Sequence, residues 1–441
     1  MASPLKIVSP QRNCLKNNIY MSKLRQIFAN KSLRKRILYT LIILALFRFL
    51  SHIPIPGVSL EELKKFFNQN ELFGLLNLFT GGAMRNFSIV MMGVGPYITS
   101  SIIFQLLTII VPQLDQLNKE GQSGRQKINH YTRILTIPLA IIQGYAMIVL
   151  LRNQGVAIEL NTAALVTTIV SMTAGTMLLM WMGELISENG IGNGISLIIT
   201  LGIIANVPLS LVQAFTVGDA SQLIGVIIII IATILVISAI IAFTEAERRI
   251  PVTYARRVRG HKTYGGVDTH LPIKVNIGGV IPIIFALSMM IFPGVIAKFF
   301  EQAKSETIVH AAKWVENLFQ NNLFYGIAYF ILVILFSYFY ATIVFQPKQV
   351  AENLQKQGGF VPGLRPGLET ANYLNSVVNK IVLVGGLFLA TIAVLPYIMQ
   401  AATGISSLML GGTGILIVVS VIIDTMRQIN AQLVMHSYEN Y

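Results

Sequence analysis

The sequence has little charge and few residues that carry out chemistry. Only 12% of its 441 residues are charged, about half the share in an average soluble domain, too few for the surface of a soluble protein of this size. Its single cysteine, Cys14, cannot form an internal disulfide. The six histidines make no pair at helical spacing, and no phosphate-binding loop, nucleophile elbow or His-Glu-x-x-His motif occurs. These absences exclude a disordered protein, a secreted disulfide scaffold and a soluble nucleic-acid-binding domain, and they predict no enzyme activity, no cofactor and no metal site.

Long apolar runs take the place of the missing charge. Hydrophobic residues make up 54% of the chain, and the mean hydropathy is +0.66. A helix needs about 20 apolar residues to cross a bilayer core about 30 Å thick. We therefore expect an all-α polytopic membrane protein with ten transmembrane helices, at residues 37–54, 88–112, 134–151, 163–183, 193–208, 222–244, 274–297, 323–345, 378–399 and 409–430.

Basic residues are distributed unevenly around these runs. Residues 1–36 hold nine lysines and arginines and no acid, so the positive-inside rule places this segment in the cytoplasm. Alternation of the spans then puts 25 basic residues in cytoplasmic segments and only 7 in external ones. We therefore expect a multi-pass protein with both termini in the cytoplasm, the second as a short tail at residues 431–441.

Two of the expected cytoplasmic loops, at about 245–273 and 346–377, are longer than a connection between helices needs. Both are basic. Loops of this kind bind either anionic lipid headgroups or an acidic partner or nucleic acid, and composition alone leaves these alternatives open. Ten spans also permit two halves of five helices, residues 37–208 and 222–430, joined by an external hinge at 209–221.

An apolar segment, Leu72–Phe87, precedes the second span and is too short to cross a membrane. It is broken by Gly81-Gly82, which is typical of a re-entrant or an interfacial element. Charge inside the spans is scarce: Arg48 lies toward the outer end of the first span, where we expect it to reach the membrane surface. No charge lies centrally, which weakens the alternative of an ion-coupled transporter for a small solute. A purely structural scaffold would leave the long basic loops unexplained.

Several stretches of the chain match one known family. They are Ile53–Gly57, Phe79–Ala83, Pro96–Leu107, Lys119–Arg125, Gly190–Ser196, Thr269–Asn276, Gly279–Phe285 and Phe360–Gly367. Over residues 33 to 430 the chain resembles the SecY/Sec61-alpha family, the pore-forming subunits of the Sec protein translocase. The resemblance implies a channel that passes unfolded polypeptides across the membrane and releases transmembrane segments sideways into lipid.

The resemblance also implies a clamshell of two pseudo-symmetric five-helix halves around an hourglass pore. The residues that match the family's constriction, called the pore ring below, are Val94, Ile98, Ile195, Ile199, Ile284 and Ile417. The segment at about 75–87 matches the family's plug and is called the plug segment; its central residues are Phe79, Thr80, Gly81, Gly82, Ala83, Met84 and Arg85. Branched aliphatic side chains are stiff and leave a dry constriction, which suits a closed pore.

Partners follow from the same resemblance. Gln143 and Asn193 match positions for polar contacts near a lateral gate. The residues that match docking sites for the motor ATPase SecA and the ribosome are Arg256, Arg257, Arg259, Lys262, Lys348 and Arg365. The single-span subunits SecE and SecG, nascent or unfolded polypeptides and membrane lipids are the other implied partners. The chain has no nucleotide motif, so the energy must come from a partner. A cell inner membrane is expected, and a thylakoid membrane also fits.

Overall fold

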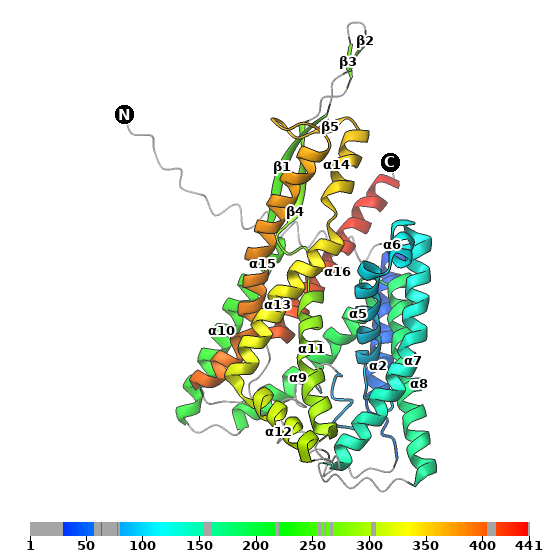
Figure 1. The fold of residues 1–441 in the computed structure, drawn as a ribbon, viewed down its shortest axis with the longest axis vertical. Helices are drawn as coiled ribbons and strands as arrows, with labels where there is room; N and C mark the ends of the chain where they lie inside the picture. Colours follow the sequence, from blue (N-terminus) through cyan, green and yellow to red (C-terminus); the bar gives the residue numbers. More distant parts are fainter. Residues whose placement is uncertain are drawn as a thin grey trace.

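The computed structural model of the chain describes residues 30–56, 63, 77, 80–153, 161–216, 220–254, 257–259, 262–264, 268–300, 306–403 and 412–439. This part of the chain is mostly helical, and most of its helices run along the long axis of the molecule (Figure 1). The helices are α2 (Lys31–Leu50), α5 (Gly95–Ile110), α6 (Pro112–Lys119), α7 (Gln122–Asn153), α8 (Thr162–Asn189), α9 (Gly194–Thr216), α10 (Ala220–Glu245), α11 (Ile281–Phe300), α12 (Glu306–Gln320), α13 (Asn322–Val344), α14 (Pro347–Lys356), α15 (Leu368–Thr403) and α16 (Gly412–Glu439).

Several of these helices have the length and composition of membrane spans. Within the described residues, five are long and apolar enough to cross a bilayer, and α5 with α6 adds a sixth if this bent pair is one span. The five lie in α7, in α8, in α13 continued by α14, in α15 and in α16. Large apolar side chains on their outer faces are exposed, among them Leu335 (59%) and Leu383 (49%). A surface of this kind is stable only in lipid, so the chain is a membrane protein.

Helix α5 begins seven residues later than the sequence predicted. The expected span started at residue 88, but residues 80–94 form a succession of turns and the helix starts at Gly95. Gly93 has φ of +57°, in the left-handed region that ends helical geometry. Pro96 then lies in the first turn, where the amide that it lacks would have had no partner within the helix. At its other end α5 meets α6 at an angle of 101°.

A small antiparallel sheet departs from the all-α expectation. Strands β1 (Glu247–Tyr254), β4 (Asp268–Lys274) and β5 (Gly359–Phe360) pair in the order β4-β1-β5. Strands β2 (Arg257–Arg259) and β3 (Lys262–Tyr264) form a separate hairpin that projects beyond the sheet (Figure 1). In β1 the side chains of Ile250 and Val252 are buried while their neighbours are more exposed, the alternation expected of a strand with one covered face.

The sheet joins the two long basic loops. Thr253 of β1 pairs with Phe360 of β5, so the segments expected at 245–273 and 346–377 meet in one structure. Ile250, Val252 and Ile273 pack in a hydrophobic cluster with residues of α13, α14 and α15. This sheet, α14, α6 and the end of α16 lie at the same end of the bundle, and α12 lies at the other end (Figure 1).

The largest hydrophobic cluster, called the central cluster below, lies where α2, α9, α11, α13, α15 and α16 come together. Within the bundle α13 packs along α15, α11 packs against α13, and α9 packs against α8 and α16. On the other side α5 packs against α7 and α7 against α8. Contacts of α7 with α11 and of α8 with α9 connect these two groups of helices.

Candidate pore constriction and plug segment

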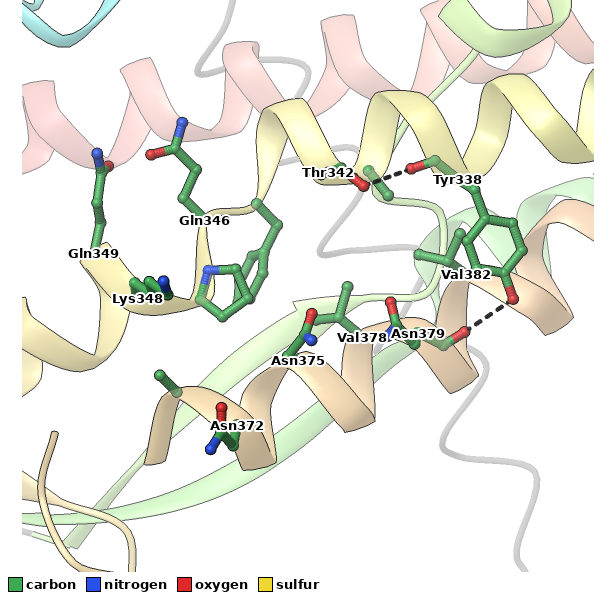
Figure 2. Close-up of a pocket in the computed structure, with 14 residues that line it drawn as sticks. Tyr338, Thr342, Gln346, Lys348, Gln349, Asn372, Asn375, Val378, Asn379 and Val382 are labelled. Atoms are coloured by element: carbon green, nitrogen blue, oxygen red, sulfur yellow. Dashed lines mark hydrogen bonds between the residues drawn. The ribbon is translucent and has the colours of Figure 1, made fainter. Parts of the chain in front are cut away.

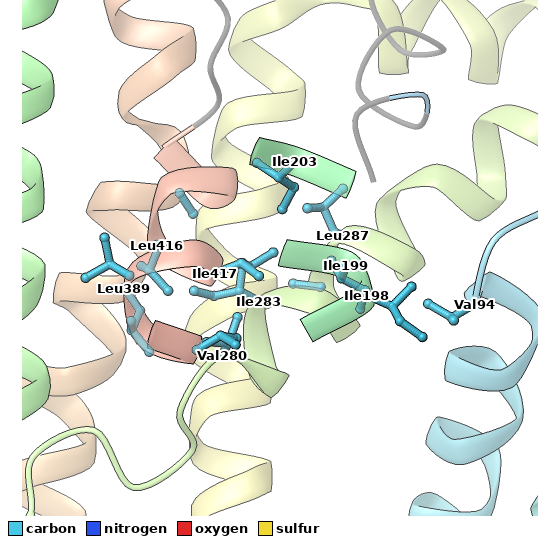
Figure 3. Packing of buried hydrophobic residues seen from close by; sticks show 14 of the residues in the cluster. Val94, Ile198, Ile199, Ile203, Val280, Ile283, Leu287, Leu389, Leu416 and Ile417 are labelled. Atoms are coloured by element: carbon cyan, nitrogen blue, oxygen red, sulfur yellow. The ribbon is translucent and has the colours of Figure 1, made fainter. Parts of the chain in front are cut away.

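All six pore-ring residues belong to the central cluster or pack against it. Val94, Ile199 and Ile417 are at most 5% exposed and are members of the cluster. Ile98, Ile195 and Ile284 are partly buried against it. Figure 3 shows Val94 beside the start of α5, Ile199 on α9 and Ile417 on α16, with side chains of α11 between them. Segments separated by more than 300 residues of sequence therefore contribute aliphatic side chains to the central cluster.

The chemistry of this place is uniform. The labelled side chains around Ile199 and Ile417 are Val, Ile and Leu (Figure 3), which offer no hydrogen-bond donor or acceptor. The backbones also approach closely, because a Cβ atom added to Gly414 of α16 would lie 3.2 Å from Ile203 Cγ2 of α9. An apolar contact as tight as this excludes water and impedes ions. Aliphatic side chains also form no hydrogen bond with a polypeptide that passes through the constriction.

The described part of the plug segment, residues 77 and 80–87, lies directly against α9 and α2; Phe79 lies outside the described residues. Ala83 is fully buried within the central cluster. Gly81 has φ of +68°, and a Cβ atom there would lie 3.0 Å from the Gly202 Cα of α9. Thr80 is buried beside Gly93, whose Cβ would lie 3.1 Å from its Cγ2. Glycine is thus required at position 81 both by its φ and by its contact with another helix.

The rest of the segment has its own hydrophobic cluster. Met84 and Phe87 are buried with Met91, Met147 and Leu151, which places the end of the segment against α7. The backbone amide of Arg85 donates to Asn77 Oδ1 at 3.0 Å. The segment therefore has one side in the central cluster and the other against α7.

Arg48 does not follow the sequence-based expectation. Its Nη1 donates to the Gly81 carbonyl oxygen at 2.6 Å, so the guanidinium is directed to the plug segment instead of the membrane surface. The sequence contains a signal for this contact, since no other lysine, arginine or acidic residue lies between Arg36 and Glu61. A lone charge in an apolar span usually has an internal partner.

The two expected gate residues have different surroundings. Asn193 is exposed at the start of α9, where its Oδ1 accepts from the Ser196 amide at 3.3 Å, as in a helix N-cap. Gln143 is half-buried on α7. The turn before Asn193 is closely packed, because the Gly192 amide donates to Gln428 Oε1 of α16 at 2.8 Å. Asn193 therefore caps the start of α9, as the helix-start pattern of Gly190–Gly194 in the sequence indicates.

The expected docking residues lie at the end of the molecule that carries the sheet. Arg257 and Arg259 are on β2, and Lys262 on β3 pairs with Arg259; Arg256 lies outside the described residues. Arg365 is exposed in the turn before α15, and its carbonyl oxygen accepts from Thr370 Oγ1 at 2.9 Å. The β1–β5 pairing joins this turn to the three-stranded sheet, from which the separate β2–β3 hairpin projects; the sheet, the hairpin and the turn are called the sheet unit below.

Lys348 lies at the rim of a groove of about 330 Å³ between α13, α14 and α15 (Figure 2). The polar side chains that line the groove are amides, hydroxyls and this one lysine, without a carboxylate. On its floor, the Tyr338 hydroxyl donates to the Asn379 carbonyl oxygen at 3.4 Å. Lys348 therefore lies on α14, next to the sheet, and not on the β2–β3 hairpin that carries Arg257, Arg259 and Lys262.

Comparison with known proteins identifies the family. A family model described as SecY matches residues 88–426. Curated relatives named protein translocase subunit SecY include that of Streptomyces scabiei, 41% identical over 94% of this chain and 98% of the relative. That of Helicobacter pylori strain 26695 is 43% identical over 93% and 98%.

The chain belongs to the SecY family.

The SecY fold is also found among solved structures. A protein-conducting channel matches with a TM-score of 0.63 at 19% identity, covering 91% of this chain and 93% of the other. Canine Sec61 in a ribosome-channel complex matches with a TM-score of 0.58 at 17% identity, with the same coverage. The family expected from the sequence is thus confirmed. SecY membership and the fold together give the chain its function class, a protein translocation channel.

Proposed function

We propose that the six pore-ring residues form the constriction of this channel and that residues 75–87 close it as a plug. The observation that carries this proposal is the convergence of Val94, Ile199 and Ile417 in one cluster with Ala83 of the plug segment. A ring made only of stiff aliphatic side chains closes to ions without offering a binding site to the translocating chain. Glycines in the plug segment favour displacement, because glycine is costly in a permanent helix.

A lateral gate between α5 and α7 on one side and α11 and α13 on the other would release apolar segments into lipid. The contact between α7 and α11 supports this seam, since among the described residues it is one of two places where helices of the proposed halves meet, the other being the contact of α9 with α16. In this proposal residues 37–208 and 222–430 form two pseudo-symmetric five-helix halves, and residues 209–221 are the external hinge. Gln143 on α7 is placed to contribute a polar contact, which is exchangeable because a paired amide stabilises only modestly.

The sheet unit is the proposed docking surface for the motor ATPase SecA or the ribosome. Its charge supports this role, because arginines such as the exposed Arg248, Arg249 and Arg365 attract anionic partners such as ribosomal RNA. Two of the solved neighbours, canine Sec61 and yeast Ssh1, are bound to ribosomes. In this reading the sheet end and both termini face the cytoplasm across a cell inner membrane or a thylakoid membrane. SecE and SecG complete the complex, and the chain itself performs no catalysis.

Photo-crosslinking of a stalled polypeptide tests the proposed path. A crosslinker placed at Ile98 or Ile284 is expected to capture a chain halted during translocation. The matched control is Ile234, an isoleucine on α10 that is 58% exposed on the outside of the bundle. Capture at Ile234 equal to that at Ile98 and Ile284 would show that the polypeptide does not pass through the ring.

A further inference from the structure

The plug segment is attached to α2 at two separate places. Near its end, Ser88 Oγ donates to the Leu50 carbonyl oxygen at 2.7 Å, and the Asn86 side chain donates to the Ser51 carbonyl oxygen at 3.3 Å. Backbone hydrogen bonds from Ile55 to Phe87 and from Ile89 to Ile53 lie at the same place. These bonds hold the segment where the chain continues toward α5, so they can persist while the residues before them move.

The second attachment is the bond from Arg48 to Gly81. It lies on the side of the segment that approaches α9, where Gly81 nears Gly202 and Ala83 enters the central cluster. The segment cannot leave the central cluster without breaking this bond, because Gly81 and Ala83 are separated by a single residue. Since the donor is charged, the bond is stronger than one between neutral groups.

We infer that Arg48 is a positioning residue that latches the plug segment in the closed channel. The inference rests on the proposed function, because it assigns a role to the segment that closes the pore. The bond is suited to this role because a guanidinium has five N–H donors and needs no fixed partner. When Gly81 leaves, water or the backbone carbonyls of an entering polypeptide can accept from Arg48, so opening does not strand a buried charge.

Thiol labelling measures the latch directly. In a chain with Cys14→Ser, the substitution Ala83→Cys places a thiol at a site that is 0% exposed. Adding Arg48→Met, which keeps the length of the side chain but removes every donor, is expected to speed maleimide labelling of position 83 about tenfold, the effect of losing a hydrogen bond from a charged group. Arg48→Lys should fall between, because an ammonium keeps the charge but lacks the planar fork. If Arg48→Met does not assemble, Arg48→Gln takes its place.

The control is Arg36→Met, the same change more than three turns away on the same helix, where the side chain is exposed. It should leave the labelling rate unchanged. Equal labelling rates for the Arg48 variants and the parent would overturn the latch. Ion conductance of the idle reconstituted channel separates the latch from the proposed function. Faster labelling with higher conductance supports both, whereas faster labelling without it supports the latch and contradicts the plug role of the segment.

Discussion

Arg133 Nε of α7 lies 2.6 Å from Glu184 Oε1 of α8. The glutamate side chain is 19% exposed and the arginine 41%, so solvent screens the attraction between the two charges only in part. It connects two helices of the proposed first half close to Tyr97 of α5. The sequence shows both charges near the ends of apolar runs but gives no indication that they meet.

Removal of one partner should destabilise this contact. Glu184→Gln is expected to lower the free energy of unfolding by about 1–2 kcal/mol, between the values for exposed and buried ion pairs. Arg133→Gln should cost a similar amount. The double variant should cost less than the sum of the two, which a double-mutant cycle on thermal unfolding in detergent would measure. Additive effects would show that the two charges do not interact.

A polar residue in the proposed ring should open the closed channel to ions. Ile417 is 1% exposed, so Ile417→Asn brings a polar amide into a cluster of apolar side chains. Conductance of the idle reconstituted channel is expected to rise. Ile417→Leu, which stays apolar, is the control and should remain closed. Unchanged conductance in Ile417→Asn would remove Ile417 from the ring.

Gly194 should tolerate no side chain. A Cβ atom there would lie 1.9 Å from the Gly183 carbonyl oxygen of α8, so the backbones of α8 and α9 would have to separate. Gly194→Ala is expected to cost about 1–3 kcal/mol, as overpacking does elsewhere. Gly95→Ala is the matched control, because a Cβ atom there has no neighbour within 4 Å. Thermal unfolding of the two variants should therefore differ, and equal melting temperatures would contradict the close contact of α8 with α9.

Charge reversal at the docking surface should stop export without affecting assembly. Arg365→Glu is expected to block motor-driven export of a secretory substrate into vesicles, since it places a carboxylate on a surface proposed to bind an anionic partner face. Membrane insertion, assayed by protease protection, should stay normal. Arg152→Glu is the control, because Arg152 is at the C-terminal end of α7, away from the sheet unit. Full export by Arg365→Glu would exclude the docking role of this turn.

Long apolar runs made a helical membrane protein predictable, because a span must satisfy its backbone internally and bury its side chains in lipid. The described residues contain five or six candidate spans, and the expected number of ten stays a prediction. The start of α5 was predicted wrongly, because residues 89–94 are as apolar as the helix that follows and composition does not reveal the left-handed conformation of Gly93. The strands of the basic loop were missed, although the apolar residues Ile250 and Val252 stand two positions apart in the period of a strand.

Contacts between distant side chains were the least predictable part of the site. The chemistry of Arg48 indicates that it needs a partner, but the partner is a backbone carbonyl that carries no sequence signal. The pore ring is a similar case, since an isoleucine in a span looks the same whether it faces lipid or another helix. Only the family resemblance distinguished Ile199 from its neighbours.

The pairing of Thr253 with Phe360 has a mechanical consequence. Strand β1 follows α10 after one residue, β4 leads toward α11, and β5 lies between α14 and α15. A force on the projecting hairpin is therefore transmitted to α10, α11, α14 and α15 through the backbone hydrogen bonds of the sheet. One of those helices, α11, borders the proposed seam, so a partner bound at the hairpin in the proposed docking mode would act on the seam without contacting it.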